Sequence, residues 1–472
     1  MSAAPSNPLP ALRPAQDPTG PAFPRWLPPK LVQLRHDSQF FHHLGTFGYP
    51  FQLWLAALWC VLNVGPMATV ELGGIAIGVC FLARLPFIYK GLWDAIRQPA
   101  VIFLTLWTLW TLILAARGGF SPDALHELGF VRWAYAFIVF WAVFDNRRIL
   151  VAGLCVGFAF AQLAQLGEFL GYRFNIPSLI WSHPPAPDPA ARISGWWHQP
   201  AVGGAMLVAC LGLHLGPALL GTGRTRLLAI TASLATLIAL LATGTRGAWL
   251  AAAVLIVIVM LAALALRIRA GNAKPLLLTL AALIAITSIS ALALQGPRTR
   301  VQLLAAEMRD VLTRDNLDSD MGGRVLAAKA ALDAAKQHPL MGVGPGNFHP
   351  HVVAYAQREG ITIAPHRLEK LKTAHNTLLH TLATQGIVGV LLLYAALACA
   401  LWGGVFPRTT AGTPSLATHL ATYAASPAVA LLGIIIVGAC ETTSLNTSTA
   451  ALSTILIALC AWVRPREQTA PQ

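Results

Sequence analysis

Long apolar segments recur along almost the whole chain, and they constrain its fold more than any other feature. A helix needs about 20 mostly apolar residues to cross a membrane. Hydrophobic residues make up 56% of the sequence, whereas Asp, Glu, Lys and Arg make up only 11%, against roughly 25% in soluble domains. Because so few charges cannot cover a water-exposed surface, we expect an all-α integral membrane protein.

Twelve segments are long and apolar enough to be candidate membrane helices, which predicts a polytopic protein with about twelve spans. The candidates lie near 50–66, 70–88, 100–116, 128–144, 149–170, 201–220, 226–243, 247–267, 275–294, 376–402, 421–440 and 447–463.

The distribution of Lys and Arg predicts the orientation, because short cytoplasmic loops retain positive charge. With the N-terminus inside, seventeen basic residues lie on the cytoplasmic side and five in short outer connections. The other eleven lie in one long outer segment, which escapes the rule. We therefore expect cytoplasmic tails at 1–48 and 464–472, with membrane helices over 49–294 and 375–463. The net charge of +14 is scattered between apolar runs, which argues against a nucleic-acid binder.

The outer segment 295–374 is too long for a simple connection. Its sequences VQLLAAEMRDVL and GGRVLAAKAALDAAKQH have helical apolar spacing, and HPLMGVGPGNF has the Gly and Pro residues of a turn. The segment therefore predicts a small helical subdomain on the outer face of the membrane.

Ionisable residues near the membrane helices gather at their outer ends, and such residues tend to mark function. A transporter would carry polar groups near the middle of the membrane, so this distribution favours a polar chamber open to the outer face. The residues are Glu127, Arg132, Glu168, Arg192, Arg246, His375 and Glu441.

Several of these residues also have a simple structural interpretation. Arg132 could extend to the membrane interface, and the three glutamates could be interfacial or hydrogen-bonded, so their roles stay open. Arg246 lies in the short connection TGTRGAWL, on the side where Arg is disfavoured. That position favours a functional role for Arg246.

No pattern in the sequence predicts a metal site or a cofactor. The seven cysteines lie in or beside apolar runs without a CxxC pair, as packing residues do. His375 and His380 are about 140° apart around a helix, so they are not a metal pair. Asp318 and Asp320 form a DxD, but we interpret this short motif as a solvated loop.

Three motifs in a fixed order carry a resemblance to a known family. They are TGTRGAWL, GGRVLAAKAAL…HPLMGVGPGNF and AHNTLLHTLATQGIVG, preceded by ARISGWWHQPAVGGAML. Over about residues 190–400 the chain resembles the O-antigen ligase family and the wider superfamily of Wzy-type polymerases and ligases. His198-Gln199-Pro200 departs from the Pro-Asn common in relatives, so we assign no role there.

The resemblance implies a GT-C-like glycosyltransferase of the bacterial inner membrane that works on the periplasmic side without a metal. It implies a glycan donor on undecaprenyl diphosphate and, for a ligase, lipid A–core oligosaccharide as the acceptor. It also implies that His375 is the catalytic base and that Arg246, Arg324 and Arg192 bind the donor.

The chemistry of such a transfer agrees with these residue types. The departing diphosphate needs fixed cations, and the guanidinium fork suits phosphate oxygens. The acceptor hydroxyl must lose a proton, which a neutral imidazole can take, and a single in-line attack would invert the anomeric carbon.

Two other interpretations remain open. A polymerase or protein O-oligosaccharyltransferase of the same superfamily would use the same donor with another acceptor. A lipid-linked glycan transporter would be a different class, and its function would survive replacement of His375.

Overall fold

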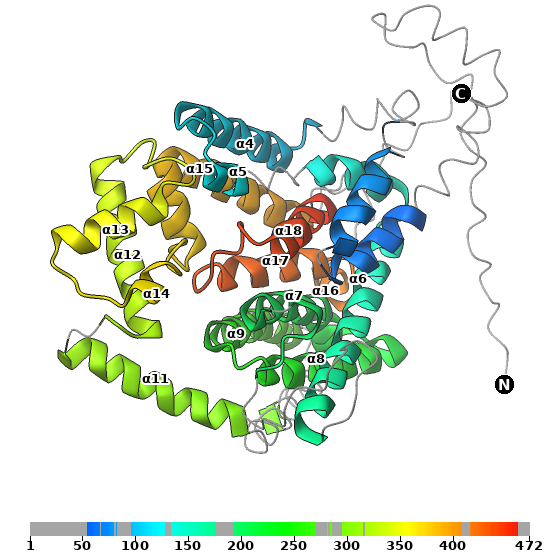
Figure 1. The fold of residues 1–472 in the computed structure, drawn as a ribbon. Helices are drawn as coiled ribbons and strands as arrows, with labels where there is room; N and C mark the ends of the chain where they lie inside the picture. Colours follow the sequence, from blue (N-terminus) through cyan, green and yellow to red (C-terminus); the bar gives the residue numbers. More distant parts are fainter. Residues whose placement is uncertain are drawn as a thin grey trace, which may run out of the picture.

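The computed structural model describes residues 54–66, 68–79, 82, 96–127, 134–174, 192–197, 199–269, 281, 284–285, 295–314, 317–406 and 416–460. These residues form helices and turns, with no strand among them, which confirms the all-α class for this part of the chain (Figure 1). The first two apolar helices are Trp54–Asn63 and Ala68–Val79. The others are α4 (Pro99–Arg117), α5 (Pro122–Glu127), α6 (Ala134–Phe174), η2 (Gly195–Trp197), α7 (Pro200–Leu220), α8 (Gly223–Ala242), α9 (Arg246–Arg269), α11 (Gln295–Arg314), α12 (Asp320–Gln337), α13 (Phe348–Arg358), α14 (Pro365–Leu368), α15 (Thr377–Val405), α16 (Leu416–Ala421), α17 (Ser426–Val437) and α18 (Thr447–Cys460).

The described helices include six that are long and apolar enough to cross a membrane: α4, residues Arg147–Tyr172 of α6, α7, α8, α9 and α15. The helices Trp54–Asn63 and Ala68–Val79, together with α17 and α18, are apolar but shorter than 18 residues. The expected count of twelve spans is therefore not reached by full-length helices in this part of the chain. The two tails and nearly all of the ninth expected span, 275–294, lie outside the described residues.

The fourth and fifth expected spans belong to one continuous helix, α6. The sequence placed a turn at Arg147 and Arg148 because of their charge. No Gly or Pro occurs between Ala134 and Ala152, so nothing in the local sequence interrupts the helical hydrogen bonds. The charged pair lies within the helix instead of ending it.

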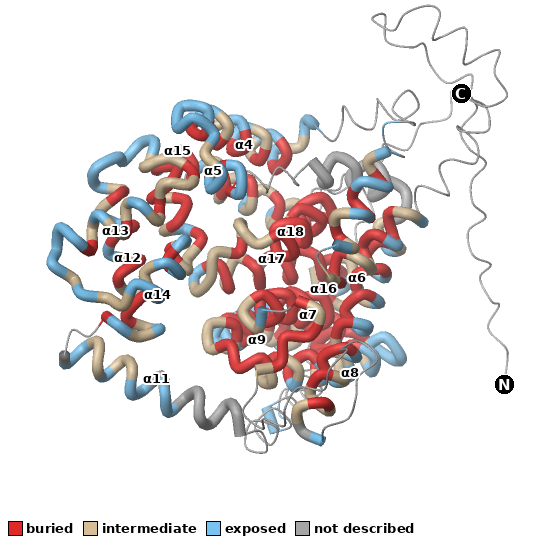
Figure 2. The backbone as a smooth tube through the Cα atoms, in the orientation of Figure 1, coloured by how far each residue is buried: buried red, intermediate tan, exposed pale blue. Residues whose placement is uncertain are grey.

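Helix α7 is the centre of the bundle, and all its residues from Val202 to Leu220 are buried (Figure 2). It packs against α8, α9 and α17. At Gly212 an added Cβ would lie 2.6 Å from the Cα of Ala430 in α17. Small residues therefore allow this close approach of two helices, as is typical in membranes.

The outward faces of α8 and α9 carry exposed leucines such as Leu228 and Leu261. Many large apolar side chains exposed on long helices are unfavourable in water. Their exposure therefore supports the interpretation that these helices face a membrane.

Helices α12 and α13, which follow α11, form a helical group beside the first part of α15 (Figure 1). The two segments expected to be helical in 295–374 correspond to α11 and α12. The group has its own core, which includes Leu326, Ala330, Phe348 and Val352.

Helix α15 is broken at Gly386, whose φ of 67° and ψ of −170° are not helical. The turn after α12 fills the break, so that the released backbone groups keep partners, as they must inside a membrane protein. The N–H of Val343 donates to the carbonyl of Ala383 (2.8 Å), that of Gly344 to Thr384 (3.0 Å), and that of Ile387 to Pro339 (2.9 Å).

The turn and the break fit together through two glycines. An added Cβ on Gly386 would lie 2.2 Å from the carbonyl carbon of Leu340, and one on Gly342 would lie 2.4 Å from that of Thr384. Both glycines have positive φ values, which other residues rarely adopt. This contact fixes the helical group of α12 and α13 against α15.

Candidate functional site

His375 lies immediately before α15, in the left-handed backbone region at φ 48°. Few residues other than glycine adopt this conformation, and it occurs often at functional sites. The next residue, Asn376, is the N-cap of α15, and its side-chain oxygen accepts a hydrogen bond from the N–H of Leu379 (2.9 Å). The helix start therefore holds His375 in an unusual, fixed orientation.

The residues beside His375 attach it to the connection between α17 and α18. The side chain of Asn376 donates to the carbonyl of Ala439 (2.9 Å), and the hydroxyl of Thr377 donates to the carbonyl of Glu441 (3.1 Å). The N–H of Thr443 in turn donates to the hydroxyl of Thr377 (3.0 Å). The motif His-Asn-Thr is thus bonded to residues 439–443.

Glu441 joins two of the residues expected at the site. One carboxylate oxygen lies 3.3 Å from Nδ1 of His375, and the other accepts from the guanidinium of Arg324. Arg324 also donates to the carbonyl of Cys440 (2.6 Å). The sequence placed Glu441 among the outer ionisable residues but gave it no role, because its partners are remote in the chain.

The charge of Glu441 is stabilised by these contacts. Burial alone would raise the pKa of its carboxyl group. The hydrogen bond from His375 and the positive charge of Arg324 outweigh burial, so the pKa lies below the usual value. A carboxylate therefore faces the imidazole at neutral pH.

Arg246 is the first residue of α9, and it reaches the neighbouring helix α11. One nitrogen of its guanidinium lies 3.2 Å from the carboxylate of Glu307. Another, Nη1, is buried and has no hydrogen-bond partner in the part of the chain that the structure describes. A buried guanidinium nitrogen without an acceptor has unused capacity to bind an anion.

Arg246 and Glu441 lie at the same end of the bundle. An added Cβ on Gly247 would lie 2.7 Å from the Cβ of Cys440, the neighbour of Glu441. The starts of α9 and α15 therefore meet around residues 439–441, and the region contains Arg246, Arg324 and His375.

Arg192 contacts the turn before Arg246. Its Nε donates to the carbonyl of Thr243 (3.1 Å), and Nη2 donates to the hydroxyl of Thr245 (3.1 Å). Arg246 and Arg324 thus face carboxylates, whereas Arg192 donates to the backbone and a side chain of a turn.

The remaining outer glutamates also have partners. Glu168 is buried and accepts from the N–H groups of Ser194 and Gly195. Glu127 accepts from the N–H of Gly346 (2.9 Å) and lies 3.6 Å from Nε2 of His380. These contacts favour the structural interpretation of both glutamates, and Arg132 lies outside the described residues.

The described residues contain no group of three His, Cys, Asp or Glu side chains placed to hold a metal. The DxD motif has an arginine partner, because Arg367 lies 3.4 Å from Asp318 and 3.1 Å from Asp320. Both carboxylates therefore help to hold α14 beside the start of α12.

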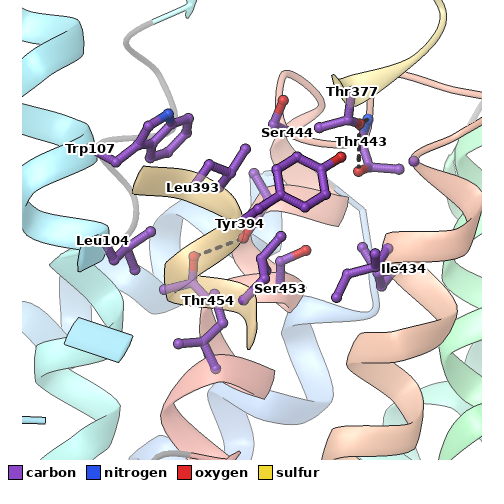
Figure 3. Close-up of a pocket in the computed structure, with 15 residues that line it drawn as sticks. Leu104, Trp107, Thr377, Leu393, Tyr394, Ile434, Thr443, Ser444, Ser453 and Thr454 are labelled. Carbon is purple, nitrogen blue, oxygen red and sulfur yellow. Dashed lines mark hydrogen bonds between the residues drawn. The ribbon is translucent and has the colours of Figure 1, made fainter. Parts of the chain in front are cut away.

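An apolar cavity lies next to the hydrogen bonds around Thr377. Thr377 and Thr443 line it together with Ser444, and its walls include Trp107 and Tyr394 (Figure 3). The cavity lies between α4, α15, α17 and α18, whose residues line it. A nonpolar chain could therefore lie close to the polar group around Glu441.

Comparison with known proteins agrees with the class that the fold suggests. Residues 231–394 match a family model described as O-Antigen ligase, a segment that includes Arg246, Arg324 and His375. No curated protein matches the chain. The long apolar helices and this match indicate an α-helical membrane protein with a segment similar to O-antigen ligases. Members of that family are membrane glycosyltransferase-like enzymes.

Proposed function

We propose that this protein is an O-antigen ligase, which transfers a glycan from undecaprenyl diphosphate to lipid A–core oligosaccharide. The observation that carries the proposal is the group His375, Glu441 and Arg324, which joins a candidate base to a candidate phosphate ligand. The matched family segment supports the reaction class.

In this proposal His375 is the general base. When Nδ1 carries the proton it donates to Glu441, and Nε2 is then free to accept a proton. The acceptor hydroxyl loses its proton to Nε2 as its oxygen attacks the anomeric carbon. A carboxylate that holds the imidazole also stabilises the imidazolium that forms, as in other base–carboxylate pairs.

The arginines stabilise the leaving group. As the bond between the anomeric carbon and the diphosphate oxygen breaks, the electron pair and the growing negative charge stay with undecaprenyl diphosphate. The unpartnered Nη1 of Arg246 and the guanidinium of Arg324 are suited to bind it. Attack opposite the departing diphosphate gives inversion.

The same geometry suggests how lipid substrates enter. The cavity beside Thr377 is mainly apolar and offers a surface to a lipid chain. We further propose that the protein lies in the bacterial inner membrane with its termini in the cytoplasm and the site on the periplasmic side.

A transfer assay with the purified full chain tests the proposal. The reaction would contain the undecaprenyl-diphosphate glycan, lipid A–core acceptor and EDTA, and the gel mobility of the acceptor would be measured. We expect transfer by wild type and by the control His366→Ala, which changes an exposed histidine of the short helix α14, and none by His375→Ala.

Other outcomes would redirect the proposal. Transfer only to a second lipid-linked glycan, or to a Ser/Thr peptide, would indicate a polymerase or a protein O-oligosaccharyltransferase. No transfer to any acceptor, from a donor that binds, would contradict the enzyme. Equal transfer by His375→Ala would remove the proposed base.

A further inference from the structure

The turn that precedes Arg246 is held from outside by another segment of the chain. Helix α8 ends at Ala242, and Gly244 in the turn has φ 61°. Helix α9 then begins at Arg246 itself. The conformation of residues 243–245 therefore sets where α9 begins and, with it, the position of the Arg246 backbone.

Arg192 contacts all three residues of this turn. Two of its nitrogens donate to Thr243 and Thr245, as described above, and the N–H of the next residue, Ile193, donates to the carbonyl of Ala242 (3.0 Å). An added Cβ on Gly244 would lie 3.3 Å from the Cγ of Arg192. The arginine thus contacts the turn through its stem as well as through its guanidinium.

The segment that carries Arg192 is itself fixed to α6. The buried carboxylate of Glu168 accepts from the N–H groups of Ser194 (2.9 Å) and Gly195 (2.5 Å) and from the hydroxyl of Ser194 (3.3 Å). Hydrogen bonds to a buried carboxylate are strong. Glu168 therefore fixes residues 194–195 firmly, and Arg192 is two residues away.

Thr245 attaches the turn to the start of α7. Its hydroxyl accepts from Arg192 and donates to the carbonyl of Pro200 (2.8 Å), the first residue of α7. The turn is consequently fixed to both α6 and α7, although it belongs to α8 and α9.

From these contacts we infer that Arg192 and Glu168 are positioning residues that hold the 243–245 turn and thereby orient Arg246. The effect on catalysis rests on the proposed function. The statement that Arg192 and Glu168 hold the turn does not depend on it. It differs from a direct role of Arg192 in donor binding, because Arg192 acts through Arg246.

Amide hydrogen exchange over residues 243–249 of the full-length protein in detergent tests the structural part. Arg192→Ala removes both side-chain hydrogen bonds, and Thr245→Val removes the hydroxyl while keeping the shape of the side chain. We expect exchange at least about tenfold faster in both variants, because opening of the turn becomes easier. Arg117→Ala, which removes an exposed arginine at the end of α4, is the control and leaves exchange unchanged.

Kinetics of transfer test the functional part. We expect Arg192→Ala to lower kcat/KM for the lipid-linked donor about tenfold or more and Thr245→Val to lower it in the same direction. If both act through one turn, the double variant is no worse than Arg192→Ala alone, within about threefold. Thermal unfolding of each variant shows that it is folded.

The outcomes separate this inference from the proposed function. Unchanged exchange in both variants, or effects on kcat/KM that multiply, would overturn the positioning role and favour Arg192 as an independent donor ligand. If wild type transfers no glycan, the proposed function fails, and the exchange experiment still decides whether Arg192 holds the turn.

Discussion

Nδ1 of His375 lies 3.3 Å from a carboxylate oxygen of Glu441, although 66 residues separate the two in the sequence. The carboxylate orients the imidazole, and its second oxygen binds Arg324. The pair therefore joins the start of α15 to the segment that follows α17. The contribution of Glu441 to catalysis can be tested separately from that of His375.

Replacing Glu441 by Gln is expected to lower kcat by roughly 10²-fold, with a smaller change in KM for the donor. The amide cannot stabilise an imidazolium, so the base loses much of a contribution that is typically 10²–10⁴-fold. Initial rates at saturating donor measure the change. Glu359→Gln, at an exposed glutamate that follows α13, serves as the control, and an unchanged kcat in Glu441→Gln would contradict this role.

The left-handed conformation of His375 predicts an order of stability among its variants. His375→Gly and His375→Asn accommodate a positive φ more readily than His375→Ala. We expect the Ala variant to be less stable than the Gly variant by about 1 kcal/mol, while all three lose transfer. Thermal unfolding in detergent measures the order, and an Ala variant as stable as the Gly variant would show that the backbone relaxes.

The contact of Gly386 with the turn after α12 predicts a large cost for any side chain there. In Gly386→Ala the new Cβ meets the backbone at Leu340, and we expect a loss of about 3 kcal/mol or more. Gly360→Ala is the matched control, because Gly360 also has a positive φ of 65° but nothing within 4 Å of an added Cβ.

The control should lose only about 1 kcal/mol, since it carries the conformational penalty alone. The difference between the two thermal stabilities then measures the steric contact. Equal losses in the two variants would mean that the backbone around Leu340 moves aside easily.

Asp333 predicts a pH-dependent contribution to the stability of the group formed by α12 and α13. Burial alone would raise its pKa, but the hydrogen bond and charge of Arg358 and the charge of His351 outweigh burial and lower it. A folded pKa below the unfolded value means that the stabilisation is complete above the unfolded pKa. It is lost as the pH falls through the lower, folded pKa.

Thermal unfolding of wild type and Asp333→Asn between neutral pH and pH 3 tests this sign. Wild type should be more stable at neutral pH, and the difference should shrink only below the ordinary aspartate range, near 3.8. A difference that grows below the ordinary aspartate pKa of 3.8 would contradict the assigned ion pairs.

Much of the fold could be predicted from the sequence because apolar length is a local property. Helices α4, α7, α8, α9 and α15 begin and end close to the expected positions. The motifs that carry the family resemblance contain His375, Arg246 and Arg324, and the structure brings these residues to one end of the bundle. Their roles stay a prediction.

Other features could not be predicted, because they depend on packing between distant segments. Hydropathy gives no sign that α15 breaks at Gly386, since a glycine within an apolar run is common in membrane helices. The partners of Glu441, His375 and Arg324, lie 66 and 117 positions away in the chain. The contact of Arg192 with the 243–245 turn likewise joins residues about 50 positions apart. Charge alone also misplaced a turn at Arg147 and Arg148, which are helical.

The ion pair between Arg246 and Glu307 has a consequence for selectivity. Arg246 and Arg324 each face a carboxylate, Glu307 and Glu441 respectively, so their positive charges are already balanced within the protein. Under the proposed function, an anion can reach the unpartnered Nη1 of Arg246, but the neighbouring charge of Glu307 repels it. A diphosphate, which carries several negative charges and several acceptor oxygens, overcomes this repulsion better than a singly charged anion such as chloride. The protein would then resist occupation by common salts, and the charge of Glu307 would assist the departure of undecaprenyl diphosphate.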